Sequence, residues 1–140
     1  MRRPLSRIAL LALLAIPAAA CDDDSTTTTP TTPTVTTITE TYSGTLQRNG
    51  GISYNFTNTA AGTLTASLTS VDPDTTAPLG IALGTWNGSA CQVILANDSA
   101  FEGASIVGST TAATSLCVRI YDSKGELNNA IAFTLTVVHP

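Results

Sequence analysis

The chain has 140 residues, of which 43% are hydrophobic, 11% are charged and 5% are aromatic. This length fits one domain, and the hydrophobic content is normal for a folded chain rather than for a charge-driven disordered one. Six Lys and Arg against ten Asp and Glu cannot supply a basic face, so nucleic acid is excluded as a partner. Threonine at 25 positions disfavours a long helical bundle, because threonine is a poor helix former.

The first twenty residues predict a secretory signal peptide. Arginines at positions 2, 3 and 7 precede an unbroken apolar run at residues 8–16, and three alanines follow at residues 18–20. A basic start, a short apolar stretch and small residues at a cleavage point are typical of export. A membrane-spanning anchor is the alternative, but the 13 residues from 8 to 20 are too few to cross about 30 Å of hydrocarbon as a helix.

Cys21 follows these alanines directly. Small residues that end on a cysteine resemble the lipobox of bacterial lipoproteins, although the leucine usual three places before the cysteine is Ala18 here. The resemblance implies that Cys21 is acylated, becomes the mature N-terminus and anchors the protein to a membrane of the bacterial cell envelope. Ordinary cleavage after Ala20 with an unmodified Cys21 is the alternative.

The other two cysteines are expected to form a disulfide. If Cys21 takes lipid, Cys91 and Cys117 remain as one pair in an exported chain, and the compartment outside the cytoplasm is oxidising. Cys117 alternates with the apolar Leu116 and Val118, which places the bridge on an outer face or at an edge between neighbouring strands. Two buried free cysteines are the alternative.

Residues 21–39 are expected to form a tether. Three aspartates follow Cys21, and residues 25–39 read STTTTPTTPTVTTIT. Such Thr/Pro-rich sequence has no core-forming period and predicts disorder or an extended chain, and residues 22–39 would span roughly 55 Å when extended. The predicted boundaries are therefore 1–20 for the signal peptide, 21–39 for the lipidated cysteine and its tether, and 40–140 for a folded domain.

The folded domain is predicted to be all-β. Its apolar period is two, and turn residues recur every eight to twelve positions. The predicted strands are residues 41–48, 52–57, 63–69, 79–86, 91–96, 104–109, 115–121 and 131–138. Eight short strands imply a two-sheet antiparallel β-sandwich or jelly roll, and Asn49-Gly50 predicts a tight hairpin between the first two strands.

Alternation along these strands also predicts which side chains lie inside. The predicted core consists of Ile52, Tyr54, Phe56, Leu64, Leu68, Leu83, Leu116, Val118, Ile120, Phe133, Leu135 and Val137. A register error of one residue would turn a whole strand inside out.

Several segments resemble the bacterial pre-peptidase C-terminal domain. They are GTL at 44–46, YNFT at 54–57, AGTLT at 61–65, the apolar strand at 79–83, CVRIY at 117–121 and FTLTV at 133–137. The resemblance covers most of residues 42–138. It implies a β-sandwich of a kind that is commonly appended to secreted hydrolases and is not itself catalytic.

The residues offer little for catalysis. His139 is the only histidine and stands next to the C-terminal residue, where termini usually fray, so a Ser–His or Cys–His mechanism is not expected. A zinc site would need more His or Cys ligands, and no cofactor is expected. The alternative enzyme is a glycoside hydrolase, which needs two converging carboxylates, and the candidates are Asp72, Asp74, Asp98, Glu102, Asp122 and Glu126.

Two other kinds of site are candidates. Oxygen ligands from Asp72 with Asp74, or from Asp122 with Glu126, could bind Ca²⁺ and would make the domain a calcium-binding adhesion module. Trp86 before a turn could offer a platform for a sugar ring or a peptide, or it could cap the end of the core. Tyr121 alternates with the apolar side chains of its strand, so we expect it on the outside or at a sheet edge.

The sequence as a whole predicts a membrane-anchored, non-catalytic envelope module that binds a partner or acts as a spacer. The candidate partners are a polysaccharide, peptidoglycan or another envelope protein. Sugar binding predicts that Trp86 or a tyrosine is exposed among polar neighbours. Protein binding predicts an exposed apolar patch or an open strand edge.

Overall fold

The computed structural model describes residues 34–140. The predicted signal peptide, the lipidation residue Cys21 and most of the predicted tether lie outside the described residues. Residues 34–37 have no regular secondary structure, and the first strand begins at Ile38. Within residues 34–140 no helix is long and apolar enough to cross a membrane.

Eight strands make up this part of the chain, as the alternation predicts. Residues 79–86 form a strand with the predicted bounds, and the other strands differ from their predictions by a few residues at their ends. The strands are β1 (Ile38–Leu46), β2 (Gly51–Asn58), β3 (Gly62–Asp72), β4 (Leu79–Trp86), β5 (Cys91–Ala100), β6 (Ser105–Thr110), β7 (Thr114–Tyr121) and β8 (Ile131–His139).

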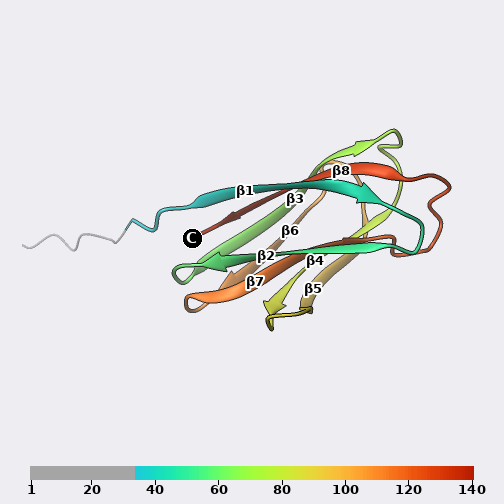
Figure 1. The fold of residues 1–140 in the computed structure, drawn as a ribbon. Helices are drawn as coiled ribbons and strands as arrows, with labels where there is room; N and C mark the ends of the chain where they lie inside the picture. The colour runs from blue at the N-terminus through green and yellow to red at the C-terminus, as the bar shows by residue number, and fades with distance from the viewer. Residues whose placement is uncertain (1–33) are drawn as a thin grey trace, which may run out of the picture. The chain divides into compact units, whose positions relative to one another are not determined.

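The strands form two four-stranded sheets, which Figure 1 shows as two layers. Sheet A has the order β1-β8-β3-β6 and sheet B the order β2-β7-β4-β5, and every pairing is antiparallel. The predicted β-sandwich is therefore confirmed, and this strand order is that of a jelly roll. Consecutive strands lie in different sheets at every connection except β4 to β5. β5 is an edge strand of sheet B and β6 an edge strand of sheet A, and the two lie on the same long side of the sandwich.

The predicted hairpin between the first two strands is wrong. Asn49 does adopt the expected positive φ of 56°, and the N–H of Gly50 donates to the carbonyl of Gln47 at 2.8 Å. The turn nevertheless leads from sheet A to sheet B, because β1 pairs with β8 and β2 with β7. Turn chemistry fixes only the local bend, whereas long-range burial against β7 and β8 decides which strand becomes the neighbour.

The core lies between the sheets where the alternation predicts it. Ten of the twelve predicted core side chains are buried, and Ile52 and Tyr54 are partly buried against them. His139, by contrast, does not fray. Its backbone pairs with Ile38 at the start of β1, and its side chain is fully buried, so the expectation that the C-terminal histidine frays is wrong.

The disulfide between Cys91 and Cys117 is confirmed, with a Cα–Cα distance of 5.7 Å. It joins β5 to β7 across β4 on the outer face of sheet B, which is one of the two predicted positions, whereas the alternative of neighbouring strands is wrong. Gly84 of β4 is the register partner of Cys117, and a Cβ on Gly84 would lie 3.0 Å from the Cα of Val93. The missing side chain lets β5 approach closely enough for the bridge to cross β4.

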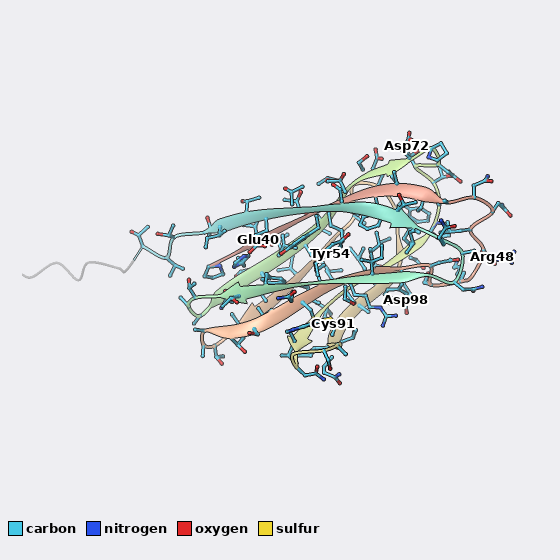
Figure 2. The ribbon with its side chains drawn as sticks, in the orientation of Figure 1. Glu40, Arg48, Tyr54, Asp72, Cys91 and Asp98 are labelled. Atoms are coloured by element: carbon cyan, nitrogen blue, oxygen red, sulfur yellow. A yellow bond between two sulfur atoms is a disulfide. The ribbon has the colours of Figure 1, made fainter. Side chains whose placement is uncertain are left out.

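The loops divide the sandwich into two ends. At one end, here called the polar end, lie the loops at residues 47–50, 73–78, 101–104 and 122–130. The other end, here called the terminal end, holds the start of β1 and the end of β8, which pair with each other. Asp72 and Arg48 lie at the polar end and Glu40 toward the terminal end (Figure 2).

Candidate functional site

Asp122 organises the polar end. Its Oδ1 accepts the backbone N–H of Gly125 at 2.9 Å and of Glu126 at 3.3 Å, and its Oδ2 accepts those of Asn49 at 3.0 Å and Leu127 at 3.4 Å. Burial raises the pKa of this carboxyl, but the four backbone hydrogen bonds together outweigh burial and lower it below the usual value. The carboxylate oxygens are thus occupied by the backbone of two loops.

The other acids of the polar end do not complete a metal site. Asp74 accepts the N–H of Thr76 at 2.9 Å and its hydroxyl at 2.7 Å, and these bonds lower the pKa of Asp74. Asp74, Asp122 and Glu126 line one polar pocket of about 360 Å³, and Asp72 does not. Among residues 34–140 no group of three or more His, Cys, Asp or Glu is arranged to hold a metal ion.

Tyr121 is packed onto sheet B. A Cβ on Gly80 would run into its ring, and the guanidinium carbon of Arg119 lies 5.2 Å from the ring centroid. Burial, followed by the hydrogen bond from the Tyr121 hydroxyl to Asp98, raises the pKa of Tyr121 to about 12. These contacts fix the ring at the polar end of the sheet, beside Asp98, which Figure 2 labels.

Trp86 stands apart from Tyr121. It is half-buried at the last position of β4, opposite Cys91, and therefore lies at the terminal end. It lines neither the polar pocket nor the groove described below. The structure does not bring the two predicted aromatic ligand-binding residues together.

One long side of the sandwich, between the edge strands β1 and β2, is closed by aromatic rings. Tyr42 and Tyr54 stack with their centroids 4.6 Å apart, and the hydroxyl of Tyr54 donates to the carbonyl of Ser43 at 3.0 Å. Burial raises the pKa of both tyrosines. Tyr54 also packs edge-on against Phe133 of the core.

The same side is tied at the terminal end by His139. Its Nε2 lies 3.2 Å from the carboxylate of Glu40, which also accepts the hydroxyl of Tyr42. Its ring packs on Phe56 at 4.8 Å between centroids. This cluster joins the first strand to the last, and its side chains close the gap between the two sheets beside β1 and β2.

The opposite long side, between β5 and β6, is open. A groove of about 310 Å³ runs there, which we call the β5–β6 groove. Its floor is made of leucines from both sheets because Gly108 has no side chain to cover them. A Cβ on Gly108 would meet only Leu83, at 3.6 Å. The lining residues are Leu64, Leu83, Gly84, Ile94, Leu95, Gly108, Ser109 and Leu116.

Exposed apolar side chains gather on the two edge strands beside this groove and on the loop between them, and two of them, Ile94 and Leu95, line it. Of the seven large hydrophobic residues that are exposed in residues 34–140, five lie on β5, on β6 or on the loop between them. Ile94 is the most exposed of them, at 75%. These five residues are Val93, Ile94, Leu95, Phe101 and Val107.

Sequence reasoning missed the β5–β6 groove, although one signal for it is present. Val93, Ile94 and Leu95 are three consecutive large apolar residues, and no other strand of residues 34–140 has such a run. Such a run predicts burial on both faces of a strand. At the edge of a sheet the same run leaves apolar surface exposed.

Comparisons with known proteins inform only on the fold. No family model matches the chain, and no curated protein matches it. Among solved structures it is similar to PliG from Aeromonas hydrophila, described as a periplasmic lysozyme inhibitor of g-type lysozyme. The match has a TM-score of 0.50 and 14% identity, and it covers 71% of this chain and 83% of that chain. Fold and site together define a jelly-roll domain with one closed and one open apolar side.

Proposed function

We propose that this chain is a non-catalytic envelope lipoprotein whose jelly roll binds a protein partner through the β5–β6 groove. The observation that carries the proposal is the contrast between the two long sides. One is sealed by Tyr42, Tyr54 and the His139 cluster, and the other exposes an apolar groove flanked by two edge strands. Exposed apolar patches of this kind mark interaction sites.

Three further features support this reading. The predicted sugar platform is divided, because Trp86 and Tyr121 lie at opposite ends of sheet B. The predicted export signal and the Cys91–Cys117 disulfide fit an oxidising compartment. The fold also occurs in PliG, a periplasmic protein whose described role is to inhibit another protein.

Filling the groove should abolish partner binding without unfolding the domain. A leucine at position 108 would occupy the space that Gly108 leaves open, since little surrounds that position. With a photoreactive amino acid in place of Ile94 in the full chain, irradiation of cells should give a discrete protein adduct. The Gly108→Leu change should reduce this adduct at least tenfold, which corresponds to about 1.4 kcal/mol of binding.

The control places the same photoreactive residue at Val107, which is also exposed but points away from the groove, as the partner of Thr65 on the outer face of sheet A. It should give far less adduct, and that adduct should not depend on Gly108. Equal labelling from both positions, or labelling that survives Gly108→Leu, would count against the groove. Circular dichroism checks that the variant remains folded.

The membrane anchor is tested at Cys21. Replacing Cys21 with serine removes the proposed acylation site, so the protein should move almost entirely from the detergent phase to the aqueous phase on phase separation, because acyl chains supply the membrane affinity. The matched variant Ala18→Leu restores the usual lipobox residue and should stay in the detergent phase. A wild-type protein that is already aqueous and has no added lipid mass would refute the anchor.

A further inference from the structure

The groove also indicates how a partner would bind. We propose that the partner contributes an extended segment that pairs with the free edge of β6 and becomes a fifth strand of sheet A. The apolar side chains on one face of this segment would fill the β5–β6 groove. This inference rests on the proposed protein-binding function and names the kind of partner that the site takes.

Of the two edge strands beside the groove, β6 is the better one for pairing. It pairs with β3 in unbroken register from Gly62–Thr110 to Ser67–Ser105. Its sequence SIVGST contains no charge and no proline, which are the residues that usually protect edge strands from pairing. β5, in contrast, shows two register shifts against β4, and such bulges disrupt an edge.

The side chains around β6 suit an added strand. Ile106 faces the core, and Gly108 two residues later lines the groove. Side chains alternate across a strand, so every second residue of an added neighbour would lie over the groove floor. Leu83 would then lie beneath these side chains, and Ile94 on β5 would form the opposite wall.

Charge favours a segment with basic flanks. Residues 49–118 contain four acids and no Lys, Arg or His. Glu102 lies in the loop that leads into β6, and Asp98 lies near the end of β5. A lysine or arginine at the polar end of the added strand would therefore lie near these two carboxylates, which stand beyond the residues that line the groove.

Shape and charge argue against a second copy of this chain as the occupant. Residues 34–140 hold seven acids and three Lys or Arg, so two copies would repel each other. Each copy also presents a concave groove at this site, and two concave surfaces are not complementary in shape. A narrow, convex element such as a strand from a different protein fits better.

The test uses the mature chain with Cys21→Ser and a nine-residue peptide, Lys-Thr-Val-Thr-Val-Thr-Val-Thr-Lys. A strand on one edge donates only every second N–H to its neighbour. Methylating the backbone nitrogens of the valines should therefore affect binding differently from methylating those of the threonines. We expect one version to bind at least tenfold more weakly than the parent peptide and the other to bind within about twofold, since several hydrogen bonds are lost in only one of them.

Two further comparisons locate the peptide. Ile94→Lys should weaken binding at least tenfold, because a charge would enter the groove. Val107→Lys, at a position that is also exposed but lies on the outer face, should change binding less than threefold. Exchanging the terminal lysines of the peptide for glutamate should weaken binding at least threefold, and equal binding would reject the basic flanks.

The outcomes separate this inference from the proposed function. Equal effects of the two methylations, or no binding of the parent peptide at millimolar concentration, would overturn strand addition. Adducts from position 94 that still depend on Gly108 would then leave the protein-binding role intact. Strand addition is supported if the methylations differ and NMR shift changes centre on β6.

Discussion

Replacing both Cys91 and Cys117 with alanine should lower the free energy of unfolding by roughly 3.5 kcal/mol, the loop-closure effect of a bridge between residues so far apart. The two cysteines are 26 positions apart in sequence, and the bridge limits the unfolded chain between them. Urea unfolding followed by circular dichroism measures the difference. An equally stable double variant would show that the bridge adds nothing to the folded domain.

The bridge should also matter for the groove. Cys91 begins β5, and Ile94 in the groove wall is only three residues further along the strand. β5 is an edge strand with an irregular register, so its neighbour β4 alone holds it weakly. We expect amide hydrogen exchange in β5 to rise in the double variant more than in β8, which lies between two neighbours in sheet A. The same change should follow reduction of the wild type, and the variant should not respond to reductant.

Alternation in the sequence was sufficient to predict the strands and their inward faces. It places Phe133, Leu135 and Val137 on one side of the last strand, and the structure buries all three. The disulfide was predicted from the export signal together with the cysteine count, since lipid on Cys21 would leave Cys91 and Cys117 as one pair. A period of two identifies which face of a strand is buried, and this information is local to the strand. Neither prediction needed to know which strands are neighbours.

Strand order could not be predicted in the same way. Asn49 takes the conformation expected of a hairpin, yet the strands on either side of it join different sheets. Because the pairing partner depends on contacts far apart in sequence, neither the open side at β5 and β6 nor the closed side at Tyr42 follows from local pattern. His139 was missed for the same reason, since only the pairing of β1 with β8 buries it.

The role of Asp122 was hidden because a loop carboxylate in the sequence carries no sign of its neighbours. Solubility or a calcium site explains such a residue equally well from sequence. In the structure it accepts four backbone N–H groups and so connects the loop after β1 to the loop after β7. A further bond links the Asp122 N–H to the carbonyl of Gly50 at 3.0 Å.

Asp122→Asn should therefore destabilise the domain by roughly 2–4 kcal/mol at pH 7, as expected for the loss of several hydrogen bonds to a buried charged group. The asparagine keeps one oxygen for one pair of N–H groups and turns its own NH₂ toward the other pair. Those two backbone donors would be left without an acceptor. Urea unfolding of wild type and variant at pH 7 measures the loss.

The pH dependence of this loss of stability distinguishes the effect of the carboxylate charge from the effect of side-chain packing. The pKa of Asp122 is lower in the folded state than in the unfolded chain, so its stabilisation is complete above the unfolded pKa of about 3.9 and disappears as the pH falls through the folded value. The gap between wild type and Asp122→Asn should therefore narrow between pH 5 and pH 2. Asp74→Asn is the matched control, because Asp74 also has a lowered pKa, but its side chain lies in an exposed turn and accepts hydrogen bonds only from Thr76. Its effect should be clearly smaller. A gap that is constant from pH 7 to pH 2 would mean that Asp122 acts through its shape and not through its charge.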